Sequence, residues 1–338
     1  MFHVHSAVAW MTPEAKSTLY FKYSMKVSGM VAPVFMFLAG ISMMLVYDKL
    51  LSQGIELSSI RRRLFRRGLQ ILAMGYGLHA LFFLLSGHWT YWLRIFKVDI
   101  LHCIGLSMMC ASRICLPKPD RRINLPALAL FLGAPVLSMI LYRAPVDSLP
   151  TPIAAYFSTT TKLSLFPIIP YGAWLGLGLF IAPFFLHGQH SNRSMRRFWI
   201  GIALCAVAMW FAGKGAKSLY YSLHLDRLGT EVPQVKGVLH FFLKKGAFVL
   251  LLFLVFGLTA PLFDRIKKRY LVRFGKTSLF AYALHLAIVY PFFGSVFRRS
   301  LTIHTHIVAT LAITVIMFGA VVAYEHFDFP TLIARSRR

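Results

Sequence analysis

Apolar runs of about 20 residues recur along nearly the whole chain, separated by short polar connections. A run of this length crosses the hydrocarbon core of a bilayer as a helix, because a helix satisfies its backbone hydrogen bonds within one segment. We therefore expect an all-α, polytopic integral membrane bundle of about nine transmembrane helices. The expected spans are residues 27–47, 68–86, 98–115, 125–142, 164–186, 197–213, 238–260, 276–296 and 304–324.

The composition supports a membrane protein rather than a soluble one. Hydrophobic residues make up 57% of the 338 positions and charged residues only 14%, which is too apolar for an ordinary soluble domain. No internal repeat, soluble domain or low-complexity tract interrupts the chain. We expect a single membrane-embedded domain over residues 1–338.

The positive charge of the chain is best explained by membrane topology. A formal net charge of +26 is compatible with a nucleic-acid partner, but the lysines and arginines cluster between the apolar runs. Cytoplasmic connections carry such an excess, so we expect no nucleic-acid binding and place every second connection in the cytoplasm. These connections hold Arg61–Arg67, Lys118–Arg122, Arg193–Arg197, Arg265–Arg273 and Arg335–Arg338.

The alternation of basic connections predicts an external N-terminus and a cytoplasmic C-terminus, in a bacterial inner (plasma) membrane. The first residues have no basic segment followed by an apolar one, so they do not form a cleavable signal peptide. Met1–Trp10 is instead typical of the last turns of a membrane helix. We therefore expect that the first helix is truncated at its start.

One apolar run holds two ionisable side chains. Asp99 and His102 lie within Val98–Gly105, and their i to i+3 spacing places them on one face of a helix. Ionisable groups are costly at bilayer depth and usually face a bundle interior or a water-filled cavity. We interpret the pair as part of a polar site. The alternative is that Asp99 lies just outside the hydrocarbon and pairs with Arg94 and Lys97.

A second set of polar side chains occurs in the next-to-last apolar run. Ser278, Tyr282 and His285 share one face of the expected helix. Such a stripe either lines a lumen or forms hydrogen bonds that hold neighbouring helices together. Both interpretations stay open at this point.

Five stretches along the chain carry a further signal. Met1–His5 matches the Met-x-x-x-His end of a first helix, and Ala32–Ser42 matches Pro-x-Phe-x-Phe-x-x-Gly-x-Ser. Asp99–Gly105 contains Ile-Leu-His-x-Ile-Gly, and Phe166–Gly178 matches a Pro-x-x-Pro-Trp segment with tyrosine in place of tryptophan. Phe274–His285 matches Gly-x-x-Ser-Leu-x-x-Tyr-x-x-His. In this order the stretches resemble the heparan-alpha-glucosaminide N-acetyltransferase-like family of polytopic membrane acyltransferases, although the family's opening Asp-x-x-Arg-Gly element is absent from this sequence.

The resemblance implies an acyltransferase activity. An acetyl or other acyl group would pass from cytosolic acyl-CoA, acetyl-CoA above all, to an amine or hydroxyl of an extracytoplasmic glycan or lipid-linked sugar, in a setting of membrane lipids. One alternative is a multi-span transporter or flippase, because carriers also use intramembrane Asp and His as proton relays. However, the half-sequence symmetry of many carriers is not visible here. The other alternative is an inactive acyltransferase-like membrane protein.

The resemblance also ranks the catalytic candidates. His5 leads, because it matches the family's Met-x-x-x-His position and a histidine can act as a base or carry the acyl group. Asp99 can orient an imidazole, and its partner is His102, His5 or neither, because the sequence does not give the helix packing. His285 completes the catalytic set, with Ser278 and Tyr282 as substrate-binding candidates. The alternative for His5 is a helix-end histidine in contact with lipid headgroups, and His3 lies close to it in the sequence.

Two further interpretations concern the acyl donor and metals. Arg62 and Arg66 are candidates for binding the phosphates of CoA; the alternative is that they set orientation and contact anionic lipid. The four cysteines form no Cys-x-x-Cys pair, and no His-Glu-x-x-His motif or Cys/His cluster occurs. We therefore expect no metal.

Overall fold

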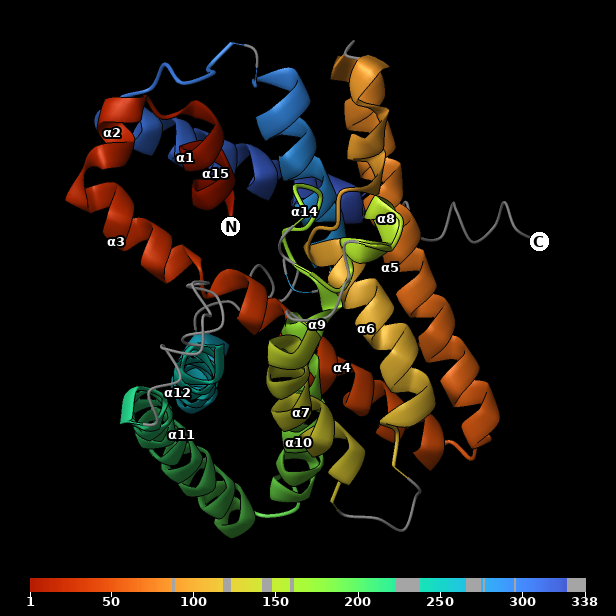
Figure 1. The fold of residues 1–338 in the computed structure, drawn as a ribbon. Coiled ribbons are helices and arrows are strands. Elements are labelled where there is room, and N and C mark those ends of the chain that lie inside the picture. Colours follow the sequence, from red (N-terminus) through yellow and green to blue (C-terminus); the bar gives the residue numbers. More distant parts are fainter. Residues whose placement is uncertain are drawn as a thin grey trace. The chain divides into compact units, whose positions relative to one another are not determined.

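The computed structural model describes most of the chain, and helices are the only regular secondary-structure elements of the part that it describes (Figure 1). No strand occurs among the described residues, which confirms the all-α expectation. The described residues are 1–86, 89–117, 123–141, 148–158, 161–222, 238–265, 275, 277–294 and 296–326.

The apolar runs become the longer helices of the structure. The described elements are α1 Phe2–Trp10, α2 Pro13–Ser17, α3 Leu19–Ser28, α4 Val31–Ser52, α5 Leu57–Ser86, η1 Trp89–Phe96, α6 Ile100–Ile114, α7 Leu125–Leu141, α8 Thr151–Ala154, α9 Ile168–Tyr171, α10 Ala173–Gly188, α11 Asn192–Ser222, α12 Val238–Arg265, α14 Ser278–Ala287, η4 Ile288–Phe292 and α15 Ile303–His326. Each expected span overlaps at least one of these helices, because a continuous apolar run favours burial of a helix on all sides.

Six described helical segments are long and apolar enough to cross a membrane, which supports an integral membrane protein. They are Leu19–Ser52, Leu57–Ser86, Ile168–Gly188, Asn192–Ser218, Val238–Leu262 and Ile303–Tyr324. The other three expected spans hold only shorter apolar helices, of 10–17 residues. The expected number of about nine transmembrane helices is therefore not confirmed.

Two of the basic clusters lie in helices and not in connections, so their expected placement was wrong. α5 begins at Leu57 and α11 at Asn192, which puts Arg61–Arg67 and Arg193–Arg197 in the first turns of long helices. Arginine is a good helix former, and its long side chain reaches water from a helix end. A basic cluster at a membrane boundary therefore does not end the helix. The basic residues at 118–122, 267–273 and 335–338 lie outside the described residues.

The chain divides into two compact units. Unit 1 comprises Met1–Val31, Leu84–Trp89 and Leu258–Arg338, and unit 2 comprises Ala32–Phe83 and Thr90–Gly257. Each is described below by itself. That the whole chain is one domain stays a prediction.

In unit 1, the N-terminal helix is packed against helices from the C-terminal part of the chain. α1 contacts α15 and η4, and α14 contacts α15. Trp10 is 1% exposed, packs with Val289 and Met317, and donates from Nε1 to the Val289 carbonyl at 3.0 Å. This packing fixes α1 beside the segment α14–η4.

In unit 2, α10 is the central helix, in contact with α6, α7, α9 and α11. It also meets α4 at very short range. A Cβ on Gly40 would lie 2.9 Å from the backbone nitrogen of Leu179, and a Cβ on Gly178 would lie 3.0 Å from that of Ile41. Glycine therefore permits this close approach of the two helices.

Candidate active site

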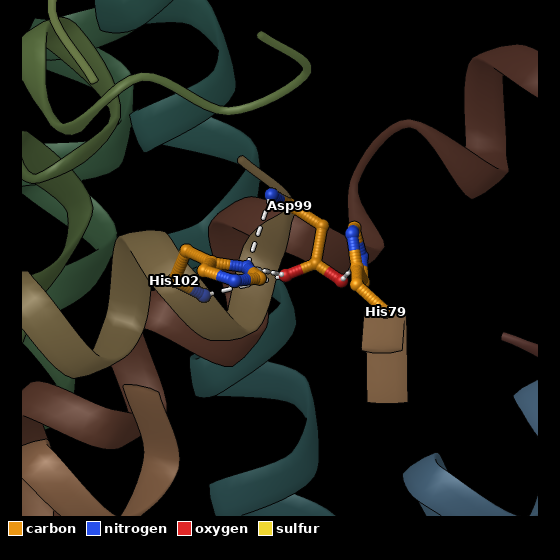
Figure 2. A group of neighbouring side chains, drawn as sticks. All are labelled: His79, Asp99 and His102. Atoms are coloured by element: carbon orange, nitrogen blue, oxygen red, sulfur yellow. Dashed lines mark hydrogen bonds and ion pairs between the residues drawn. The ribbon is translucent and has the colours of Figure 1, made fainter. Parts of the chain in front are cut away.

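Asp99 lies at the start of α6 and connects two histidines (Figure 2). Its Oδ1 accepts hydrogen bonds from the backbone N–H groups of Leu101 at 2.9 Å and His102 at 3.3 Å, so the carboxylate caps the helix. The same oxygen lies 2.6 Å from Nδ1 of His102. The other oxygen, Oδ2, lies 3.0 Å from Nε2 of His79 on α5.

Backbone hydrogen bonds hold this helix start in place. The Val98 N–H donates to the Leu163 carbonyl at 2.8 Å, and the Leu165 N–H donates to the Val98 carbonyl at 2.9 Å. Val98 is completely buried. Asp99 therefore follows a residue that is fixed by the segment preceding α9, which limits where its carboxylate can point.

The ion pairs of Asp99 within the described residues are to histidines, and none is to Arg94 or Lys97. Its side chain is only 11% exposed. The nearby amine of Lys97 is itself partly enclosed, and this burial lowers its pKa, while the Asp99 charge acts in the opposite direction. Asp99 thus belongs to a sheltered group with imidazoles, as the interpretation as a polar site expects.

The carboxylate fixes the tautomer of His102. A carboxylate only accepts hydrogen bonds, so Nδ1 of His102, at 2.6 Å, carries the proton. A protonated Nδ1 cannot accept from the backbone N–H of Asp99, whose 3.4 Å contact is the weaker one. The lone pair is then on Nε2, which is buried and has no hydrogen-bond partner among the described residues. This is an imidazole arranged to accept a proton or a hydrogen bond.

Residues of α5 enclose the His102 ring. The Tyr76 ring meets it edge-on at 4.4 Å between centroids, and the Tyr76 hydroxyl hydrogen-bonds that of Tyr156. A Cβ on Gly75 would lie 2.8 Å from Cε1 of the ring. Glycine at position 75 therefore leaves the space that the imidazole occupies.

Sequence reasoning missed His79, Tyr76 and Tyr156. His79 lies in the expected span 68–86, one helical turn after Tyr76. The criterion that selected Asp99, an ionisable side chain in an apolar run, also selects His79. Tyr156 lies near the expected span 164–186 but outside it, and the sequence carries no comparable signal for it.

His79, Asp99 and His102 also resemble a set of metal ligands. One ligand atom from each lies within 4.8 Å of the others in the described part of the chain. However, two ligands of a tetrahedral zinc ion are about 3.3 Å apart, because each bond is about 2.0 Å long. The 2.6 Å between Nδ1 of His102 and Oδ1 of Asp99 is too short for that and is typical of a charge-assisted hydrogen bond. The donor set does not fit a metal in this arrangement, and the expected absence of a metal stays a prediction.

The other expected catalytic residues come together in unit 1. Nδ1 of His5 lies 3.0 Å from the Tyr290 hydroxyl. Its ring centroid lies 5.2 Å from that of His285 and 6.4 Å from that of Tyr282. Tyr290, in η4, was not among the sequence candidates. We call His5, Tyr282, His285 and Tyr290 the His5 group.

His285 has the same kind of fixed tautomer as His102. Its Nδ1 lies 3.0 Å from the Ala281 carbonyl, so Nδ1 carries the proton and donates it. Its Nε2 is buried and has no hydrogen-bond partner in the part of the chain that the structure describes. Ser278 begins α14 and is half-buried, so Ser278, Tyr282 and His285 lie on one helix, as expected.

Arg62 and Arg66 are exposed in the first turns of α5. Their side chains are therefore accessible to a phosphate group or to a lipid headgroup. The structure does not test either role, and both stay predictions.

These features define a class: a polytopic membrane protein that shelters histidines with fixed tautomers. The family model described as heparan-alpha-glucosaminide N-acetyltransferase, catalytic, matches residues 1–225, which is more than half of the 338 residues. The chain belongs to this family, as the five sequence stretches indicated, and the membership supports a membrane acetyltransferase activity. Comparisons with curated proteins and with solved structures found no match.

The matched region contains some of the site candidates. His5, Arg62, Arg66, Asp99 and His102 lie within residues 1–225. The stripe on α14 lies after it. The contact of His5 with Tyr290 and His285 therefore joins a matched residue to the part of the chain beyond the match.

Proposed function

We propose that the protein transfers an acetyl group from cytosolic acetyl-CoA to an amine or hydroxyl of an extracytoplasmic glycan or lipid-linked sugar. Family membership supports the reaction class, and the apolar helices support the membrane setting. The observation that extends the proposal to named residues is the His5 group. The ring centroids of His5 and His285 lie 5.2 Å apart. The His285 ring has a fixed tautomer, and its Nε2 has no hydrogen-bond partner among the described residues.

The reaction requires a proton acceptor. The thioester C–S bond breaks and a C–N or C–O bond forms, while the acceptor loses a proton and the CoA thiolate gains one. An imidazole with a free nitrogen can carry that proton between the two. We propose that His5 contacts the reacting groups, either as the base or as the carrier of the acyl group, because it matches the histidine of the family motif. His285 is the second imidazole of the site.

The tyrosines of the His5 group have separate roles in this proposal. The Tyr290 hydroxyl, 3.0 Å from Nδ1 of His5, orients that ring. Tyr282 and Ser278 bind the acceptor, and a hydroxyl donor at this place can stabilise the oxyanion that forms on the acetyl group. These are the substrate-binding positions expected from the sequence.

Asp99 and His102 form a second proton-handling pair, in unit 2. The carboxylate at 2.6 Å supports the positive charge that develops when Nε2 of His102 takes a proton. We propose that this pair serves the same transfer reaction, with Asp99 acting through His102.

The donor side of the proposal rests on topology. Arg62 and Arg66 lie exposed at the start of α5, where guanidinium groups pair well with the phosphates of CoA. By the positive-inside rule, we propose that the start of α5 lies in the cytoplasm, with the N-terminus outside and the C-terminus inside, in a bacterial inner membrane.

The experiment is an assay of acetyl-CoA turnover by the full chain in membranes. Membranes with and without the protein are supplied with acetyl-CoA that carries a labelled acetyl group, together with glucosamine and a membrane glycolipid fraction as acceptors. We expect protein-dependent release of free CoA and label in a sugar or lipid. Absence of both, from protein shown to be folded, would overturn the transferase proposal in favour of a transporter, a flippase or an inactive relative.

A further inference from the structure

We propose that His79 is a positioning residue that carries a positive charge, holds the Asp99 carboxylate and thereby keeps His102 neutral with a free Nε2. The use that His102 makes of that nitrogen rests on the proposed function. The protonation states of the three residues do not, and they are measurable in the absence of any reaction.

The partners of His79 determine its protonation. Nε2 of His79 lies 3.0 Å from Oδ2 of Asp99, and Nδ1 lies 3.3 Å from the backbone carbonyl oxygen of Arg94. A carboxylate and a carbonyl both accept hydrogen bonds and have no proton to offer. Each ring nitrogen of His79 therefore donates, and an imidazole that donates from both nitrogens is an imidazolium.

The hydrogen bonds to Asp99 are consistent with one positive partner. Figure 2 shows the carboxylate between the two rings, with His79 at one oxygen and His102 at the other. The charge of His79 balances that of Asp99, so the pair is neutral without help from His102. A further proton on His102 would give a buried Nε2–H that has no acceptor among the described residues, and burying such a charged group without a partner is costly. His102 therefore stays the neutral member.

The surroundings also favour a single imidazolium. In the described part of the chain, the other charged and titratable groups near the three residues include Arg94, Lys97, Tyr76, Tyr156 and Cys103. The two cations disfavour a second positive charge, since like charges close together raise the free energy of the charged form. The hydroxyls of Tyr76 and Tyr156 form a hydrogen bond with each other. The contact of Tyr76 with His102 is therefore between the two rings.

The position of His79 explains why a side chain on α5 can act on α6. Its two hydrogen bonds join α5 to the carbonyl end of η1 and to the cap of α6. A histidine in this place fixes Oδ2, so that Oδ1 faces the backbone N–H groups and Nδ1 of His102. Without the His79 imidazolium, the helix cap stays intact. The Asp99 carboxylate then has only His102 as its histidine partner.

The first measurement is of protonation, on the full chain with ¹⁵N-labelled histidine in lipid nanodiscs at pH 7.5. We expect one histidine with both ring nitrogens protonated, whose signals disappear in His79→Gln. The signals that disappear in His102→Gln should be those of a histidine with a protonated Nδ1 and an unprotonated Nε2. A neutral His79 in the wild-type spectrum would overturn the proposal, whether or not the protein transfers acetyl groups.

The second measurement is the pH profile of acetyl transfer. In His79→Gln, Asp99 loses its positive partner, so the pH profile should change in shape, with the loss of activity concentrated on the acid side. A charge-preserving His79→Lys variant should keep the wild-type acid limb. His304→Gln, at an exposed histidine of α15, is the matched control and should change nothing. A His79→Gln profile lowered equally at every pH would show a purely structural residue and contradict the proposal.

Discussion

Three buried histidines of the described chain have one ring nitrogen bonded and the other without a partner. His102 is bonded through Nδ1 to Asp99, and His285 through Nδ1 to the Ala281 carbonyl. His306 is bonded through Nε2, 3.0 Å from the Ser6 hydroxyl. A buried polar atom without a partner costs about 1–3 kcal/mol, so retaining it indicates a use beyond packing. For His102 and His285, that use is proton transfer in the account given above.

Asp99→Asn separates the two roles of this side chain. The amide oxygen still caps α6, so Asp99→Asn should be more stable than Asp99→Ala by about 1 kcal/mol, the contribution of the cap. The neutral amide no longer supports the positive charge that His102 takes up, and its NH2 group faces His79, so transfer should slow by about 10²–10⁴-fold. Thermal unfolding in detergent and the transfer rate measure the two effects. An Asp99→Asn variant of full activity would remove Asp99 from the reaction.

Individual residues were predictable where a polar side chain stands in an apolar run. Asp99 and His102 were found on this ground, and their i to i+3 spacing correctly brought them together. His79 lies in an equally apolar run, but its contact spans 20 residues and depends on how α5 packs against α6. The pairing of His5 with Tyr290 spans 285 residues, a separation over which sequence spacing says nothing about contact.

The packing of α5 on α6 is the feature of the helices that builds the Asp99 site. A Cβ on Gly105 would lie 2.7 Å from the backbone nitrogen of Leu72, and a Cβ on Gly68 would lie 2.7 Å from the Gly105 carbonyl oxygen. The two backbones thus nearly touch, as at other small-residue contacts of membrane helices. One and two turns further along α5, this approach brings Gly75 and His79 to the side chains at the start of α6.

Gly75→Ala tests this contact, and Gly77→Ala is its control on the same helix. The added methyl group at position 75 meets the His102 ring at 2.8 Å, while nothing lies within 4 Å of a Cβ at position 77. Gly75→Ala should destabilise the protein by about 1–3 kcal/mol and displace the imidazole, lowering transfer at least about tenfold. Gly77→Ala should keep wild-type activity. Equal behaviour of the two variants in unfolding and transfer assays would show that the ring does not occupy this place.

Helix positions followed from the apolar runs more reliably than helix ends did. The runs mark where a helix is buried, but they do not mark where it stops. At the start of α5 and of α11, arginines continue the helix into the polar region. α6 and α7 are shorter than a bilayer-spanning helix, although both helices are apolar. Hydropathy cannot distinguish these cases, because a protein interior and a lipid tail favour the same residues.

The whole molecule is a membrane protein of the heparan-alpha-glucosaminide N-acetyltransferase catalytic family. The family was predictable from five short stretches in a fixed order, each of them weak alone. The number of spans was not, because three of the expected ones are short helices. The site candidates fall into two groups, one in each compact unit: the His5 group in unit 1 and the Asp99 pair with His79 in unit 2.

Transfer across a sealed bilayer tests the central claim most directly. The full chain is reconstituted in vesicles in one orientation, with labelled acetyl-CoA on the side of Arg62 and Arg66 and glucosamine or a glycolipid on the other. We predict labelled acceptor with the wild type and with His304→Ala, whose exposed imidazole lies outside the His5 group. Folded His5→Ala should lose at least about 10²-fold in rate, as expected for removal of a general base or acyl carrier. Labelled acceptor formed as fast by His5→Ala as by the wild type would contradict the account.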